Sequence, residues 1–570
     1  MPQPRYPVRR PVQDPLPKGQ RRSAGTTLAQ VQQQAVKAQG ADARRRGKPA
    51  VDDAAVGHPT GHDHSSMKAG AEARAAAVQG PTGLPVATGG RWSLGPTLPS
   101  PAIHSVMLNT GKVLVIAGSG NQWEQFSAGT FTSALWDPKT NTLKDIATPH
   151  DMFCAGHVIL RDGRVLVTGG TIGYPAYDAA GNLTRDWKGS KKSYIFDPIK
   201  EIYEPTDDLN IGRWYPTLTR MGNDQVVGVA GLDEGSSERG GLDTPVNEIF
   251  TPNAGSTWDA WQGGSWSVLN TRAFPQYAHM ILTDDGELFY TGQSTANNGQ
   301  SPGLWQPYSN SWRDVTGLPY RWQRNAGGSI LLPPAQDQKV LVMGGGDFAL
   351  PALNDTHIVD LSEPDPTYQE GPAMANAKLY VGAITLPDYT VMQTNGAAQF
   401  REVGVRDAQI YDPTANAWTT MNSPSIDRLY HSAALLLPDG RVVTMGSQVI
   451  SGENELRMEI FEPPYLFTGQ RPTIGAGPTW IDYDTANQPT WEVTAAPGAS
   501  IARVSLLRPS ATTHSTDTEQ RLVDLPFTAQ NGQVSVNVPT NRDLLPPGWY
   551  MLTVLDSQGR PSVAKWVSLN

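Results

Sequence analysis

The feature that most constrains the fold is a repeat that begins near residue 92 and runs through seven copies. Each copy holds a short apolar strand, a tight turn, a second apolar strand and a Gly-rich end. Clear copies run from His157 through Asp162-Gly163 to Gly169-Gly170, and from His431 through Asp439-Gly440 to Gly446. Asp-Gly between apolar runs is a strong hairpin signal. The repeat therefore predicts a succession of β-hairpins.

Several copies carry a second marker, an aromatic residue followed by Asp-Pro or Thr-Pro, which we interpret as an outer strand. The four examples are Leu135-Trp136-Asp137-Pro138, Ile195-Phe196-Asp197-Pro198, Ile249-Phe250-Thr251-Pro252 and Ile410-Tyr411-Asp412-Pro413. Seven units of roughly 50–60 residues match kelch-type blades, each a four-stranded sheet. We therefore predict an all-β chain with a seven-bladed kelch-type β-propeller over residues 91–466.

The repeat stops after Tyr465, and residues 467–570 read as a separate all-β module. Strands are expected at 502–507 and 534–538, and the run 546–555 leads into a last hairpin. About 100 residues of short strands indicate an immunoglobulin-like sandwich. Two folded units also suit the length, because 570 residues exceed what one hydrophobic core supports.

Residues 1–90 differ in composition and are predicted to form a weakly ordered basic arm. They are rich in Pro, Gln, Ala and Arg, and they hold few large apolar side chains. No apolar segment of a secretory signal follows the Arg pairs near the start. The arm also holds His58, His62 and His64, which are either simply solvated or able to capture a metal ion.

The charge distribution excludes one class of partner. The arm carries net +7, which leaves −16 on residues 91–570 within a total of −9. Phosphate binding needs clustered cations, so nucleic acid is not expected as the partner. No run of about 18 apolar residues predicts a membrane span. We expect a monomer.

Cys154 is the only cysteine in the chain, so it cannot form an intrachain disulfide. It is either an inert core residue or a thiol kept for its reactivity. Its position favours the second reading, because it lies just before the first strand of the second repeat. Tyr215 opens the third repeat, and Tyr430-His431 opens the seventh. In a propeller such positions converge near one end of the central axis.

A structural role for these side chains is the competing interpretation. His104, His157 and His279 lie at similar places in other repeats, so a histidine there need not be a ligand. Buried tyrosines also make ordinary hydrogen bonds. The combination of one Cys, two Tyr and a His is harder to explain in this way.

These residues carry a resemblance to a known family. The segments His150-Asp151-Met152-Phe153-Cys154 and Arg428-Leu429-Tyr430-His431-Ser432 resemble the copper-radical oxidases, which comprise galactose oxidase and glyoxal oxidase. A third segment, from Arg508 through His514-Ser515 to Arg521, resembles the C-terminal histidine motif of that family. The similarity covers about residues 92–570. The context Arg213-Trp214-Tyr215 is closer to the glyoxal oxidase branch.

The resemblance implies a role for each of five residues. Cys154 would be joined to the ring of Tyr215 by a thioether bond, forming a Cys-Tyr redox cofactor. Tyr215, His431 and His514 would be equatorial ligands of one copper ion, and Tyr430 its axial ligand. Nitrogen and oxygen donors in a near-square arrangement suit Cu(II). His514 is expected on a sandwich loop that reaches into the propeller channel.

The resemblance also implies the reaction. Oxidation of a primary alcohol or a hydrated aldehyde removes two electrons, of which copper accepts one and the cross-linked tyrosyl radical the other. Tyr430 would accept the substrate proton as a general base, and dioxygen would be reduced to hydrogen peroxide. The implied partners are a small aldehyde or alcohol and dioxygen. The family also implies secretion or display at the cell surface, with intracellular residence left open.

Two departures from the family and two other readings accompany this prediction. The arm is too short and polar to be the N-terminal carbohydrate-binding domain of galactose oxidase. The tryptophan that shields the radical there has no equivalent in Asp233-Glu234-Gly235. The main alternative function is a non-catalytic kelch propeller that binds a protein or carbohydrate. The 16 Trp also suggest a wall-associated carbohydrate binder, although propellers use tryptophan structurally.

Overall fold

The computed structural model describes residues 77–570, except 180–181, 234, 236–242, 254–262, 297–298, 321–323, 347–350 and 484–487. Strands dominate the described residues, and helices are confined to a few short turns. The all-β prediction is thereby confirmed. No helix in this described part is long and apolar enough to cross a membrane. Most of the predicted arm, with His58, His62 and His64, lies outside the described residues.

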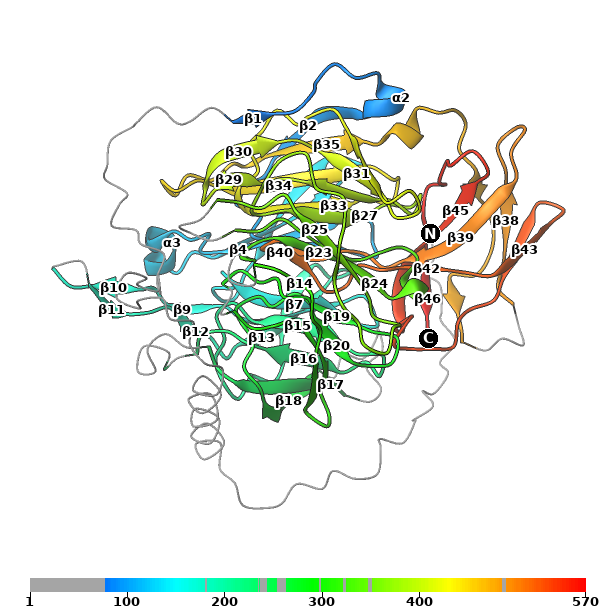
Figure 1. Cartoon of the computed structure of the whole chain (residues 1–570). Helices are drawn as coiled ribbons and strands as arrows, with labels where there is room; N and C mark the ends of the chain where they lie inside the picture. The colour runs from blue at the N-terminus through cyan, green and yellow to red at the C-terminus, as the bar shows by residue number, and fades with distance from the viewer. Residues whose placement is uncertain are drawn as a thin grey trace.

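Seven sheets follow one another along residues 91–462 in the order that the repeat predicts (Figure 1). The first four, from the innermost strand outward, have the following strands. Blade 1 has β3 (His104–Met107), β4 (Val113–Gly118), β5 (Thr132–Asp137) and β6 (Thr142–Ala147); blade 2 has β7 (Ala155–Ile159), β8 (Val165–Gly169), β13 (Ser193–Asp197) and β14 (Ile202–Pro205); blade 3 has β15 (Thr217–Arg220), β16 (Val226–Val229), β17 (Val246–Pro252) and β18 (Gly264–Thr271); blade 4 has β19 (Met280–Leu282), β20 (Leu288–Tyr290), β21 (Gly303–Gln306) and β22 (Ser311–Asp314).

The remaining three blades keep the same antiparallel order. Blade 5 has β23 (Gly328–Leu331), β24 (Lys339–Met343), β25 (Thr356–Asp360) and β26 (Gln369–Glu370); blade 6 has β27 (Gly382–Thr385), β28 (Val391–Thr394), β31 (Gln409–Asp412) and β32 (Ala417–Thr420); blade 7 has β33 (Tyr430–Leu436), β34 (Val442–Gln448), β35 (Arg457–Glu462) and β2 (Arg91–Thr97).

The ring is closed by its two ends, because the outermost strand of blade 7 comes from the start of the propeller. β2 pairs antiparallel with β35, with Arg91 opposite Glu462 and Trp92 opposite Phe461. The Trp92 indole also donates a hydrogen bond to the carbonyl of Asn422, at 2.7 Å. The closure therefore joins residues more than 300 positions apart.

The Asp-Pro or Thr-Pro marker lies at the end of the third strand in the four blades that carry it, blades 1, 2, 3 and 6, with a fourth strand outside it. The motif works as a turn signal. Asp137 accepts a hydrogen bond from the backbone N–H of Lys139, and Asp412 accepts one from Thr414. A carboxylate that binds the backbone two residues on favours this turn.

Inserted elements lie at the end of the propeller where the inner strands begin. Between β4 and β5 lies the short helix α3 (Trp123–Ala128). Blade 2 carries β9 (Thr171–Gly173), β10 (Ala176–Tyr177), β11 (Leu183–Arg185) and β12 (Lys188–Gly189), and blade 6 carries β29 (Ala397–Gln399) and β30 (Glu402–Arg406). The described end of the arm also packs here, with β1 (Val78–Gln79) paired to β30, and it continues into α2 (Val86–Gly89).

The C-terminal module consists of two packed sheets, as the predicted immunoglobulin-like sandwich requires. One sheet has β36 (Thr473–Ile474), β38 (Thr490–Thr494), β44 (Gln533–Val536) and β43 (Phe527–Gln530); the other has β37 (Trp480–Ile481), β46 (Lys565–Leu569), β45 (Gly548–Asp556), β39 (Ile501–Leu507) and β42 (Leu522–Asp524). Their buried faces share one apolar cluster with side chains of blades 4 and 5. Sandwich and propeller therefore share a core. The boundary at residue 466 stays a prediction.

One segment of the C-terminal module leaves the sandwich and joins the propeller (Figure 1). β40 (Ala511–Thr513) pairs antiparallel with β3, with Thr513 opposite His104, and β41 (Thr516–Asp517) follows it. His514 lies in the turn between β40 and β41, on a segment of the C-terminal module that reaches the propeller as expected, and β40 adds an inner strand to blade 1. Backbone pairing fixes its register, so His514 is held at the axis.

Candidate metal centre

The residues just before the inner strands of blades 2, 3 and 4 are joined by backbone hydrogen bonds. The N–H of Tyr215 donates to the carbonyl of Cys154 at 3.0 Å, and the N–H of Tyr277 donates to Tyr215 at 3.1 Å. Cys154 and Tyr215 have φ of 60° and 68°, and His431 and His514 have φ of 58° and 47°. Non-glycine residues adopt this left-handed conformation only where the surroundings impose it. The blade geometry therefore turns these four side chains toward a common point.

The structure brings together all five residues that the sequence singled out. The Cys154 thiol and one ring nitrogen each from His431 and His514 lie within 4.8 Å of one another. The hydroxyls of Tyr215 and Tyr430 are in hydrogen-bond contact. The ring centroids of Tyr215 and His514 are 4.8 Å apart, and those of His431 and His514 are 4.7 Å apart. One thiol, two phenols and two imidazoles thus share a small buried volume.

The neighbour of His514 decides which of its nitrogens is free. The Thr513 hydroxyl donates to the carbonyl of Ile103 at 3.2 Å and lies 2.6 Å from Nδ1 of His514. A hydroxyl has one proton, so Nδ1–H of His514 must donate to Thr513. Nε2 then carries the lone pair, and it is buried without a hydrogen-bond partner among the described residues. This arrangement is typical of a metal-ligating histidine.

The local environment disfavours charge on these groups. Burial raises the pKa of Cys154 and Tyr215, and it lowers the pKa of His514. Burial also raises the pKa of Tyr430, whereas Arg401 above its ring lowers it. The hydrogen bond between the two phenols raises the pKa of Tyr215 and lowers that of Tyr430. These directions favour Tyr430 over Tyr215 as the phenol that loses its proton.

An indole lies on Tyr215, and the sequence reasoning missed it. The rings of Trp214 and Tyr215 are nearly parallel, at an interplanar angle of 9° with centroids 3.8 Å apart. Trp187 stacks in turn on Trp214 at 4.6 Å and 8°. The resemblance places the shielding tryptophan downstream of Tyr215, near Asp233. The stacked indole is instead the residue directly before Tyr215, where the unusual φ lets two consecutive rings face each other.

Two other side chains at the centre were also missed. The guanidinium of Arg401 lies 3.9 Å from the centroid of the Tyr430 ring, and Tyr277 stacks on His514 at 4.5 Å. Tyr277 occupies the same place in blade 4 as Tyr215 in blade 3, so the repeat itself could have indicated it. Arg401 lies in the β29–β30 hairpin inserted in blade 6, where no motif marks it.

A cavity adjoins Tyr430 on the side of blades 4 to 6. Its walls are mainly apolar, and the lining residues are Thr295, Asn325, Ala326, Leu379, Tyr380, Phe400 and Tyr430. The hollow is narrow, with room for about one water molecule. This hollow touches Tyr430, one of the five singled-out residues.

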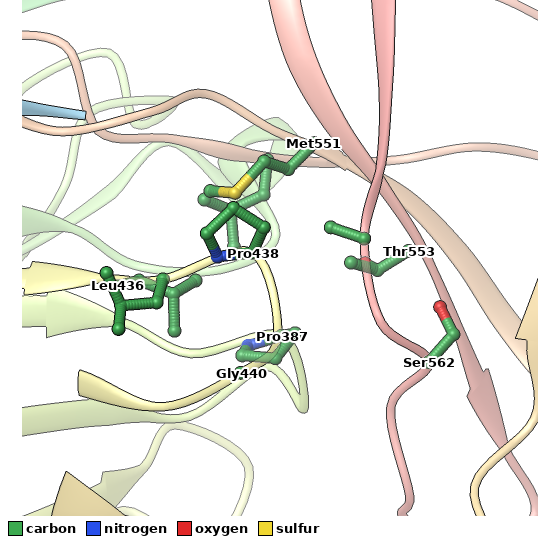
Figure 2. Close-up of a pocket in the computed structure, with 10 residues that line it drawn as sticks. Pro387, Leu436, Pro438, Gly440, Met551, Thr553 and Ser562 are labelled. Carbon is green, nitrogen blue, oxygen red and sulfur yellow. The ribbon is translucent and has the colours of Figure 1, made fainter. Parts of the chain in front are cut away.

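A second hollow lies between blades 6 and 7 and the sandwich (Figure 2). Leu436, Pro438 and Gly440 face Met551, Thr553 and Ser562 across it. It holds no cluster of titratable groups and is distant in the fold from the strand starts. This hollow is a packing gap at the interface, and the chemistry lies at the axis.

Comparison with known proteins agrees with this arrangement. The family model "Galactose oxidase-like, Early set domain" matches residues 471–569. Galactose oxidase of Gibberella zeae is 28% identical over 513 residues, covering 84% of this chain and 70% of that protein. Aldehyde oxidase GLOX of Vitis pseudoreticulata is 26% identical over 490 residues, covering 77% and 85%. A fungal alcohol oxidase solved in complex with copper superposes with a TM-score of 0.70 at 22% identity, covering 84% and 99%.

In fold and in sequence this chain is thus similar to galactose oxidase-like oxidases. This similarity confirms the resemblance to the copper-radical oxidases seen in the sequence. Relatives named for galactose and for aldehydes are about equally distant from it, so identity alone does not select a substrate.

Proposed function

We propose that this chain is a copper-radical oxidase that oxidises small primary alcohols or hydrated aldehydes with dioxygen and releases hydrogen peroxide. The observation that carries the proposal is the convergence of the Cys154 thiol with the nitrogens of His431 and His514 within 4.8 Å. The phenols of Tyr215 and Tyr430 meet at the same place. A propeller that only binds a partner needs none of these groups at its axis.

The donor set fits one copper ion. His431 and His514 supply imidazole nitrogens, and Tyr215 and Tyr430 supply phenol oxygens, which are donors that Cu(II) accepts. The buried Nε2 of His514, which the Thr513 contact leaves available as a donor, is the clearest sign that these residues suit a cation. Copper bound there would accept one of the two substrate electrons and pass it to dioxygen.

The second electron requires a protein side chain, and we assign it to Tyr215 cross-linked to Cys154. Formation of the thioether removes the thiol hydrogen and one ring hydrogen of Tyr215, and dioxygen accepts the two electrons. The Cys154 thiol is fully buried and in hydrogen-bond contact with Tyr215. Trp214 covers one face of the Tyr215 ring. We propose that this indole shields the radical.

Tyr430 is the proposed base, and the adjoining cavity is the proposed substrate site. Both the contact with Tyr215 and the cation of Arg401 lower the pKa of Tyr430, so they stabilise its phenolate. A substrate hydroxyl in the cavity would reach this oxygen directly. The wall of Leu379, Phe400 and Ala326 supports a small substrate with an apolar remainder.

Intact mass and peroxide production test the proposal together. The full-length protein is loaded with copper in air and assayed with glyoxal, methylglyoxal, galactose and a short primary alcohol. We expect a loss of two hydrogens, absent in Cys154→Ala, and peroxide from at least one substrate. A Cys154 thiol that remains alkylatable after loading, together with no peroxide from any substrate, would overturn the oxidase. Secretion and a monomeric state stay predictions.

A further inference from the structure

A continuous row of aromatic rings leads from the proposed radical site to the protein surface. From Tyr215 the row passes to Trp214 at 3.8 Å and to Trp187 at 4.6 Å between ring centroids. It continues to Tyr174 at 4.4 Å and ends at Trp123, 5.7 Å further. We call these five residues the aromatic row.

The two ends of the row differ sharply in exposure. Tyr215 is 1% exposed, and Trp187 and Trp214 are 1% and 2% exposed, whereas Trp123 is 50% exposed. Every ring in the row is an indole or a phenol, the aromatic side chains that lose one electron most easily. The row therefore joins a buried redox group to solvent without a gap.

Other rings near the site do not offer this connection. Tyr277 and Tyr380 contact the site residues but are buried, at 1% and 4% exposure. Phe153 and Phe126 also touch Tyr174, yet a benzene ring is much harder to oxidise. Among the described rings in contact with one another here, Trp123 is the exposed, easily oxidised one.

We propose that the aromatic row is a redox port, which carries one electron between the cross-linked Tyr215 and a small outer-sphere one-electron oxidant or reductant that meets Trp123 at the surface. The port rests on the proposed function, because it requires a redox-active Tyr215. It assigns the route by which single electrons would pass between the site and reagents too large to enter the substrate cavity.

Electrons and protons balance along the row. In activation, one electron leaves Tyr215 and reduces the external oxidant by one, while each ring between them loses an electron and regains it. The three indoles can pass as cation radicals that keep their N–H protons. A phenol proton on Tyr215 moves to Tyr430 through the hydrogen bond between their hydroxyls. Reduction of the radical reverses every step.

Tyr174 needs a proton acceptor, since an oxidised phenol loses its proton, and the structure supplies one. Its hydroxyl lies 2.8 Å from the Ser119 hydroxyl, which interacts in turn with the Asp151 carboxylate. The Ser119 hydroxyl can accept the Tyr174 proton while its own proton passes toward the Asp151 carboxylate, which also accepts from the backbone N–H of Ser119 at 2.8 Å. The phenol proton can therefore shift toward Asp151 and return when Tyr174 regains an electron.

The surface half of the row is built from insertions outside the blade framework. Trp123 lies on α3, none of whose residues is buried. Tyr174 and Trp187 lie in the blade 2 insertion that contains β9 and β12. Blade closure does not need α3, yet it places an indole against Tyr174. A shared cluster that includes Cys154, Trp214 and Tyr215 continues inward from there.

Stopped-flow oxidation of the reduced, copper-loaded protein by ferricyanide tests the port. High ionic strength is used so that Glu124, next to Trp123, does not repel the reagent. We compare the parent with Trp123→Phe and Tyr174→Phe, which keep a ring but remove the easily oxidised group. The second-order rate of radical formation should fall at least fivefold in both variants, with the final radical signal unchanged.

Phe126→Leu is the matched control. Phe126 lies on the same helix and contacts both Trp123 and Tyr174, at 5.7 and 4.9 Å, but it is not easily oxidised. Its replacement should leave the rate unchanged. Unaltered rates in Trp123→Phe and Tyr174→Phe would overturn the port alone, because the parent would still form the radical. A parent that forms no radical would overturn both the port and the proposed cofactor.

Discussion

The indole of Trp214 lies flat on the ring of Tyr215, with centroids 3.8 Å apart and planes 9° from parallel. Both residues are buried, and they are consecutive in the chain. This contact is possible because Tyr215 has φ of 68°, which folds its side chain back toward its predecessor. A radical on Tyr215 would therefore be covered on one face by a polarisable ring.

The first prediction follows from that contact. Trp214→Leu should shorten the lifetime of the oxidised, radical form about fivefold, since a stacked aromatic pair is worth about 1 kcal/mol beyond area burial. Trp214→Phe keeps a stacked ring and should lie between the leucine variant and the parent. Decay of the radical absorbance in the absence of substrate measures both. Equal lifetimes in all three proteins would show that the indole does not shield the radical.

The Thr513 hydroxyl should control copper affinity through His514. Thr513→Val removes the acceptor for Nδ1–H of His514, so the imidazole loses both its orientation and its tautomer preference. Loss of such a supporting contact typically weakens metal binding about 10- to 100-fold. Thr513→Ser retains the hydroxyl and should bind nearly as well as the parent. Competition with a chromogenic copper chelator gives both affinities, and a parent-like valine variant would contradict the assigned role.

Arg401 should matter for turnover more than for copper binding. Its guanidinium lies over the Tyr430 ring and lowers the pKa of that phenol, which burial raises. Arg401→Leu leaves the base harder to deprotonate, so kcat/KM near neutral pH should fall at least about tenfold. The acid limb of the pH profile of kcat/KM should also move to higher pH. Arg401→Lys keeps the positive charge and should restore part of the rate. A leucine variant with the same pH profile as the parent would show that Arg401 does not set the pKa of Tyr430.

The repeat made the fold predictable to a large extent. Asp-Gly turns and Gly-rich ends recur often enough to count seven blades, and axial convergence of strand starts follows from that architecture. The closing strand β2 (Arg91–Thr97) carries none of these signals. It becomes a strand by pairing with β35. Its partner lies at the other end of the repeat, where no local pattern indicates it.

The candidate site was predictable where residues sit at repeat positions and unpredictable where insertions supply them. Cys154, Tyr215 and Tyr430-His431 stand at blade entries, which the repeat marks. The sequence placed His514 on a loop of the C-terminal module, but the pairing of β40 with β3 beside it depends on long-range backbone contacts that no local pattern indicates. Arg401 comes from the β29–β30 hairpin, which the repeat does not mark. The stacking of Trp214 on Tyr215 depends on a backbone angle that composition does not reveal.

A buried histidine outside the site should set part of the acid sensitivity of the fold. His279 is 1% exposed, and burial lowers its pKa from 6.5 to about 3. His279 is therefore protonated below about pH 6.5 in the unfolded chain, but only below about pH 3 in the folded chain. Stability falls as pH drops through this window, and the loss reaches about 3 kcal/mol near pH 4.5.

His279→Asn removes this titration and can keep a hydrogen bond to Ser329, whose hydroxyl lies 2.8 Å from Nδ1 of His279. The variant should be less stable than the parent near pH 7, where neutral His279 packs well. The difference in free energy of unfolding should then shift in favour of the variant by about 3 kcal/mol at about pH 4.5. Urea unfolding of the metal-free proteins at the two pH values measures the shift. A difference that does not change with pH would mean that His279 is protonated in the folded protein well above pH 4.5.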